Sequence, residues 1–115
     1  MKILVVEDDP NIQRLYKEEF EQEGYEIVVA STGKEAIKLF DSEVPDLVTL
    51  DILLPDIDGI RLLWLMKERR PTVPIIMSTA YDYKSDFAVW ASDAYIVKSS
   101  DLDKLKSTIK NLLGM

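Results

Sequence analysis

Positions 47–59 read LVTLDILLPDIDG, and the order of residue types in this segment indicates the fold class. Four residues that suit a short buried strand end at a carboxylate, Asp51, and a proline and a glycine then mark a loop before the next helical pattern. A strand, a loop and a helix in this order form one repeating unit of a parallel α/β sheet. The stretch therefore predicts an α/β fold with Asp51 at the C-terminal end of a strand.

Three further apolar runs end in polar side chains in the same way. Glu7 and Asp8 follow the run at 3–6, Thr79 follows the run at 75–78, and Lys98 follows the run at 95–97. Parallel strands present their carboxyl ends at one edge of the sheet, which is where such folds bind ligands. The four strand ends therefore indicate one site that combines carboxylates, a hydroxyl and an ammonium group.

The alternation of β-rich runs with helical patterns predicts a single domain over residues 1–115. Strands are expected at 2–6, 26–30, 47–50, 75–78 and 94–97, and helices at about 10–23, from 33 after a Thr32 capping box, at 60–69, at 84–91 and after position 100. Strands that are apolar almost throughout are typical of a parallel sheet with helices on both faces. Right-handed crossovers leave few topologies, and one is the doubly wound order 2-1-3-4-5, in which Glu7 and Asp8 stand beside Asp51.

Composition narrows the function classes. The 115 residues include 47% apolar residues, and 14 basic against 21 acidic residues give a net charge of −7, which disfavours direct nucleic-acid binding. No apolar run approaches the roughly 20 residues of a membrane span, and the start lacks a signal-peptide pattern, so we expect a cytoplasmic protein without a membrane partner. Cysteine and histidine are absent, so a bound metal is expected to be a hard, oxygen-liking cation.

Several conspicuous side chains have a structural interpretation. Asp9 is expected to cap the first helix, and Asp56 and Asp58 are expected to be loop and cap residues. The inner positions of the third helix are expected to be Ile60, Leu63 and Met66. The larger aromatic side chains are expected to lie in the core or at its margin, and these are Tyr16, Phe20, Phe40, Trp64 and Phe87.

Taken together, these motifs resemble the receiver domains of bacterial two-component response regulators, among them the chemotaxis regulators, whose flavodoxin-like sheet has the order 2-1-3-4-5. The most specific element is the run from Asp51 to Gly59, in which an aspartate and apolar residues precede a proline and an Asp-Gly pair. An acidic pair after the first strand, Thr79-Ala80 after the fourth and Lys98 after the fifth complete the pattern. The resemblance covers residues 2–113.

The resemblance implies that Asp51 accepts a phosphoryl group as an aspartyl phosphate. A carboxylate that attacks a phosphoryl group faces charge repulsion, so catalysis consists mostly of positioning and charge neutralisation. Thr79 and Lys98 are expected to contact the phosphoryl oxygens, and Lys98 supplies a compact positive charge. Tyr95 is expected to change rotamer on activation, with Thr79 as the other half of the switch.

The resemblance also implies a metal site. Mg²⁺, with Mn²⁺ as an alternative, is expected to be ligated by Asp8, Asp51 and the backbone carbonyl of Leu53, while Glu7 acts largely through water. Mg²⁺ keeps several waters and takes few carboxylates, which suits this set of oxygen ligands better than a closed cage.

Two features depart from the family. Ser99 stands where a proline usually follows the lysine, and because a cis bond before a non-proline residue costs roughly 2.5–4 kcal/mol, we expect a trans Lys98–Ser99 bond and a rearranged loop. The stretch from Thr79 to Tyr95 is about one helical turn shorter than usual. The fourth helix is therefore expected to be short or displaced, and the family's usual dimer through this face is not assumed.

The leading interpretation is a signalling module that a sensor histidine kinase or a phosphotransfer protein phosphorylates on Asp51. It would catalyse only its own phosphoryl transfer and dephosphorylation, and would signal to an output domain, a partner or a second copy. One alternative is a degenerate receiver that acts as a protein-binding module, as Ser99 and the short fourth helix allow. The other is a small Mg²⁺-dependent aspartyl-phosphate phosphatase, which Leu53 disfavours because such enzymes place a second acid at that position.

Overall fold

Five parallel strands form one sheet in the predicted order β2-β1-β3-β4-β5. They are β1 (Lys2–Val6), β2 (Glu26–Ala30), β3 (Leu47–Leu50), β4 (Ile75–Thr79) and β5 (Ala94–Val97). β4 is one residue longer than predicted, because Thr79 still pairs with Val97. The structure, a computed structural model, describes residues 1–79, 92–98 and 101–114. The predicted fourth helix, Phe87 and the Lys98–Ser99 bond lie outside these residues.

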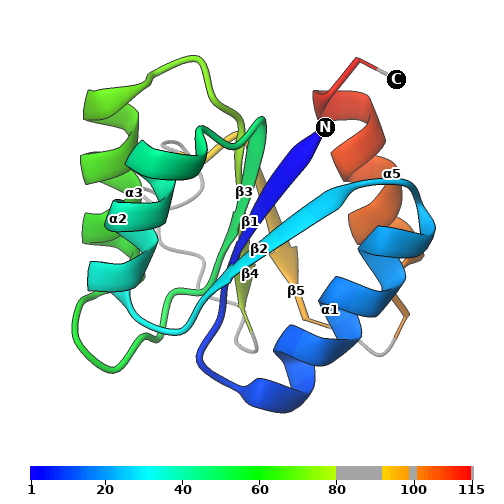
Figure 1. Ribbon diagram of the computed structural model, residues 1–115, viewed down its shortest axis with the longest axis horizontal. Helices are drawn as coiled ribbons and strands as arrows, with labels where there is room; N and C mark the ends of the chain where they lie inside the picture. The colour runs from blue at the N-terminus through cyan, green and yellow to red at the C-terminus, as the bar shows by residue number, and fades with distance from the viewer. Residues whose placement is uncertain (80–91, 99–100, 115) are drawn as a thin grey trace.

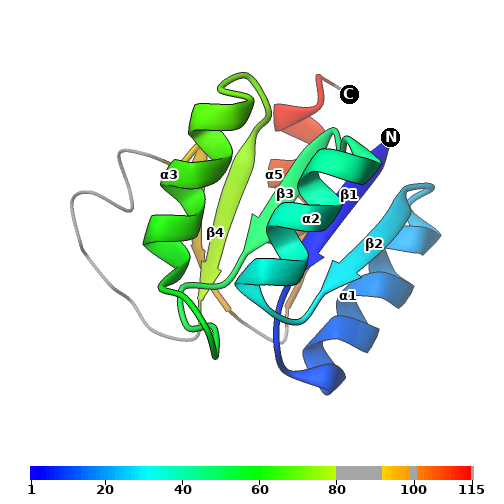
Figure 2. The ribbon, with the colours of Figure 1, turned by 60° about the vertical axis from the view of Figure 1, so that its left-hand side comes forward.

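Helices cover both faces of the sheet, as Figures 1 and 2 show. α2 (Gly33–Glu43) and α3 (Gly59–Arg69) pack on one face, and α1 (Pro10–Gln22) and α5 (Asp103–Leu112) on the other. Alternate residues of β1 point to opposite faces of the sheet. Leu4 and Val6 are buried under α2 and α3, in the α2–α3 layer, and Ile3 and Val5 are buried under α1 and α5, in the α1–α5 layer. None of the helices in the described ranges is long and apolar enough to cross a membrane.

The helices α1, α2 and α3 start at the predicted capping residues. Asp9 accepts a hydrogen bond from the backbone of Asn11 (2.8 Å) and Asp58 accepts one from Ile60 (2.8 Å). At α2 the Thr32 hydroxyl accepts from the Glu35 backbone (3.1 Å), while the Glu35 carboxylate accepts from the backbone of residue 31, one position before the cap. The capping box is therefore present in a form shifted by one residue.

The predicted inner face of α3 is partly wrong. Leu63 and Met66 are fully buried as expected, but the third fully buried position is Leu62, and Ile60 is only partly buried. Trp64 falls on the outer side of the helix and is 49% exposed, so it is not a core residue. Because this segment is apolar almost all round, its pattern does not define one face.

Candidate functional site

The carboxyl edge of the sheet brings Glu7, Asp51 and Lys98 together from three strands. Glu7 follows β1 and Asp51 follows β3, and the last residues of these neighbouring strands, Val6 and Leu50, lie opposite each other. The backbone N–H of Asp51 donates to the carbonyl oxygen of Val6 (3.1 Å), which holds the two strand ends in register. Lys98 follows β5, the strand at the edge of the sheet, and its long side chain reaches back to both carboxylates.

Three carboxylates gather at this edge. One oxygen from each of Glu7, Asp8 and Asp51 lies within 4.8 Å of the other two. Glu7 is 2% exposed and Asp51 8% exposed, whereas Asp8 lies at the solvent-exposed rim. Buried like charges at this spacing are unfavourable unless a cation or a proton compensates them. The structure thus joins the three acids that the sequence analysis placed together, in a cluster open on the side of Asp8.

Lys98 is the cation that faces the two buried acids. Its Nζ atom donates to Oδ2 of Asp51 (3.1 Å) and forms an ion pair with Oε1 of Glu7. Burial raises the pKa of Glu7 to about 7, with the charge of Asp51 adding to the rise and Lys98 opposing it. Burial alone would lower the pKa of Lys98, but the hydrogen bond to Glu7 and the two carboxylate charges outweigh it, so the pKa is raised. The amine therefore remains protonated at physiological pH.

Gly59 explains the spacing of the Asp51–Gly59 motif. Its N–H donates to the carbonyl of Ile52 (2.8 Å), and a Cβ at this position would overlap the carbonyl oxygen of Asp51 and lie 2.6 Å from Cα of Ile52. Only glycine allows α3 to begin this close to the backbone of Asp51. Within the loop, the N–H of Leu53 donates to Oδ1 of Asp51 (3.3 Å) and orients the carboxylate. The side chain of Leu53 is half exposed.

The cluster fits a hard divalent cation. Its side-chain ligands are carboxylate oxygens, which Mg²⁺ prefers over nitrogen or sulfur ligands. Lys98 supplies one positive charge against three carboxylates. A divalent cation at the exposed side of the cluster would supply the missing charge.

Of the two predicted switch residues, the structure describes the side chain of Tyr95 but not that of Thr79. Thr79 ends β4, but its side chain lies outside the described part of the structure, so its predicted contact with a phosphoryl group stays a prediction. Tyr95 pairs with Met77 and is partly buried against the α2–α3 layer. The rotamer change expected of Tyr95 likewise stays a prediction.

Sequence reasoning missed two polar contacts of α1 beside the site. Gln13 donates its side-chain amide to the carbonyl of Glu7 and to the hydroxyl of Ser31 (2.9 Å). One turn further on, the hydroxyls of Tyr16 and Ser78 are hydrogen-bonded (3.1 Å), and both residues are buried. The signal in the sequence was the spacing of three residues between Gln13 and Tyr16, which places both on one face of the helix.

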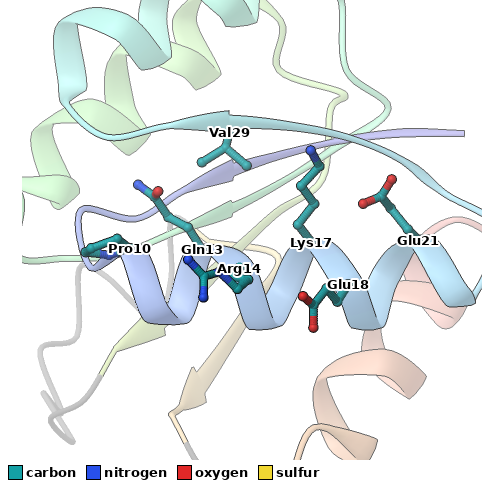
Figure 3. A pocket seen from close by; sticks show the side chains of 7 residues that line it. All are labelled: Pro10, Gln13, Arg14, Lys17, Glu18, Glu21 and Val29. Atoms are coloured by element: carbon teal, nitrogen blue, oxygen red, sulfur yellow. The ribbon is translucent and has the colours of Figure 1, made fainter.

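An open groove runs along α1 next to the acidic cluster. Figure 3 shows Gln13, Lys17 and Glu21 projecting from α1 toward β2, where Val29 faces them. The groove begins at Pro10, and none of the three clustered carboxylates lines it. Gln13 is the link between the groove and the site, because its side chain also contacts the carbonyl of Glu7.

Comparison with known proteins gives consistent matches. The family model of the response regulator receiver domain matches residues 3–110. The chain is 35% identical, over 97% of its length, to the alkaline phosphatase synthesis transcriptional regulatory protein PhoP of Bacillus subtilis, and it spans about half (48%) of that relative.

Two solved structures are also similar. One is response regulator protein TrrA from Thermotoga maritima in complex with Mg²⁺-BeF, with a TM-score of 0.92 and 47% identity over 96% of this chain and 97% of that one. The other is TrrA in complex with histidine kinase ThkA, with a TM-score of 0.91 and 48% identity over 97% of both chains.

Proposed function

Because the chain belongs to the response regulator receiver domain family, we propose that it accepts a phosphoryl group on Asp51 from a histidine kinase or a phosphotransfer protein. The observation that carries this proposal is the convergence of a buried, oriented carboxylate with two further acids and a lysine at one sheet edge. The complex of TrrA with histidine kinase ThkA supports a kinase as the partner. The protein is then a signalling phosphoacceptor without a metabolic substrate.

In the reaction, a carboxylate oxygen of Asp51 attacks the phosphorus of a phosphohistidine. The new O–P bond forms as the P–N bond breaks, and the departing imidazole takes up a proton. The N–H of Leu53 holds one carboxylate oxygen and Nζ of Lys98 holds the other, so the nucleophile is oriented before the phosphoryl group arrives. Lys98 then offsets negative charge on the phosphoryl oxygens, which is the main demand of such a transfer. Water returns Asp51 to its free form by hydrolysing the acyl phosphate.

The acids at this edge are proposed to hold Mg²⁺. Asp8, Asp51 and the carbonyl of Leu53 would be its ligands, with Glu7 acting largely through water. When bound, Mg²⁺ neutralises the acidic cluster and aligns the phosphoryl group with the nucleophile. The complex of TrrA with Mg²⁺-BeF supports this assignment, and Mn²⁺ is an alternative of similar ligand preference.

The phosphoryl group is proposed to act through Thr79 and Tyr95. A hydroxyl drawn toward the new charge at the end of β4 leaves space that an aromatic side chain on β5 can occupy, and the phosphoryl group biases an equilibrium between two packings. A receiver domain passes its signal to another domain or protein. PhoP is a transcriptional regulatory protein, and this chain spans about half of it. An output domain or a second copy is therefore the proposed recipient of the signal.

A direct test is incubation with a small acyl phosphate and Mg²⁺, followed by intact-protein mass measurement. We expect a gain of one phosphoryl group that chelation of the metal prevents. Asp8→Asn should slow labelling by roughly tenfold or more, because it removes a proposed metal ligand. Asp41→Asn is the matched control, since Asp41 is paired with Arg69 on the outside of the molecule.

Labelling at the wild-type rate in the chelated sample or in Asp8→Asn would contradict the metal assignment. No labelling of the wild type under any condition would favour the binding-module alternative. Sustained turnover of acyl phosphate would favour the phosphatase alternative, which the leucine at position 53 already disfavours.

A further inference from the structure

Asp56 lies in the loop that follows Asp51, but it is hydrogen-bonded to a helix that precedes this loop in the chain. Oδ1 accepts from the backbone N–H of Gly33 (2.8 Å) and Oδ2 accepts from that of Lys34 (3.0 Å). These are the first two residues of α2, whose own cap, Thr32, accepts from Glu35 instead. Asp56 therefore pairs two of the N–H groups that a helix start cannot pair within itself.

The neighbouring residue makes a second contact at the same place. A Cβ on Gly33 would overlap Cγ2 of Ile57, so the absence of a side chain at Gly33 is what allows Ile57 to pack against the first turn of α2. The two backbone hydrogen bonds lower the pKa of the Asp56 carboxyl, which is therefore ionised at the positive end of the helix dipole. A charged contact and an apolar contact together tie the loop to α2.

This tie acts on the segment that holds the proposed metal ligands. The loop carries Asp51 and Leu53 at its start, and at its end Gly59 is fixed to the backbone of Ile52. Between these points, the side chains of Asp56 and Ile57 contact a different element, α2, and Asp56 does so through two hydrogen bonds. A loop that is already ordered before the cation arrives loses less conformational freedom on binding.

We propose that Asp56 is a positioning residue for divalent cation binding, because its two hydrogen bonds to α2 hold residues 51–59 in the metal-binding geometry. The inference rests on the proposed function, since it takes the acidic cluster to be a cation site. In this role Asp56 acts through a different helix, α2, and not as a cap of the helix that follows its own loop.

The test compares Mg²⁺ affinity, measured by calorimetric titration, in folded wild type, Asp56→Ala and Thr32→Ala. Asp56→Ala removes both bonds to α2, and we expect it to weaken Mg²⁺ binding by roughly tenfold, the lower end of the range for groups that orient metal ligands. Thr32→Ala is the matched control, because it removes a cap from the same helix start without touching the loop. It should lower the melting temperature and leave the Mg²⁺ affinity unchanged.

A second measurement needs no metal. Amide hydrogen exchange at residues 53, 54 and 56–58 of the metal-free protein should become faster in Asp56→Ala and not in Thr32→Ala. Asp56→Asn keeps one acceptor oxygen and should fall between the wild type and the alanine variant in both measurements. Wild-type Mg²⁺ affinity and exchange rates in Asp56→Ala would overturn the inference alone, whereas a wild type that binds no Mg²⁺ would overturn the proposed function and this inference with it.

Discussion

At the scale of single residues, Glu7 shows how strongly this fold perturbs one side chain. Burial beside Asp51 raises its pKa from 4.5 to about 7. Between these two pH values the folded protein binds a proton that the unfolded chain has already released. Stability that comes from this proton is fully present below pH 4.5 and is lost as the pH rises through about 7.

We therefore expect the free energy of unfolding of the metal-free protein to fall between pH 5 and pH 7.5 more steeply in the wild type than in Glu7→Gln. The pKa difference corresponds to at most about 3 kcal/mol over this window. Urea denaturation in the presence of a chelator measures it. Glu18→Gln, which changes an exposed glutamate of α1, should keep the wild-type slope. Parallel curves for wild type and Glu7→Gln would mean that Glu7 is already ionised in the fold.

Sequence reasoning placed the acids and Lys98 at one edge because each follows a strand, and the structure brings Glu7, Asp8, Asp51 and Lys98 together there. It did not predict that Glu7 would be almost completely buried. It also identified Asp56 only as a loop or cap residue. The bonds from Asp56 to α2 join positions 23 or 22 residues apart, and local patterns contain no information on such contacts.

At the scale of elements, the strands were predicted well and α3 less well. Strand bounds agree because each strand is a short apolar run enclosed by turn residues, and β4 alone extends one residue further. α3 carries apolar side chains at Leu62, Leu63, Trp64, Leu65 and Met66, so no single face stands out in the sequence. Gly59 starts the helix against the backbone of Asp51, and this contact sets which of these side chains face the sheet.

The ends of β4 and β5 are the elements that we expect to respond to phosphorylation. Adding Mg²⁺ and beryllofluoride should shift the backbone amide resonances of Thr79 and of residues 95–98, as well as those of the loop 51–59, because the proposed switch links the strand ends to Asp51. Two-dimensional NMR measures these shifts, and Asp51→Asn under the same conditions should show none of those at Thr79 and residues 95–98. Shifts restricted to residues 51–59 would describe a receiver in which the site is not coupled to β5.

At the scale of the whole molecule, topology assembles the site from segments far apart in the chain. Glu7 and Lys98 are 91 residues apart and meet because β1 and β5 belong to one parallel sheet with all carboxyl ends at one edge. The order 2-1-3-4-5 was predicted from the handedness of crossovers, which leaves few topologies, together with the family resemblance that the sequence motifs carry. The individual hydrogen bonds of the site, such as those of Lys98 to Glu7 and Asp51, depend on side-chain packing. They are therefore visible only in the structure.

Asp51 is the proposed phosphoacceptor of this chain. The most direct measurement is peptide mass mapping of the protein after incubation with Mg²⁺ and an acyl phosphate, with hydroxylamine treatment to confirm an acyl phosphate linkage. We predict one labile phosphoryl group on the peptide that contains Asp51, and none anywhere in Asp51→Ala. A phosphoryl group that persists in Asp51→Ala, or that maps to another residue of the wild type, would show that the phosphoacceptor is not Asp51.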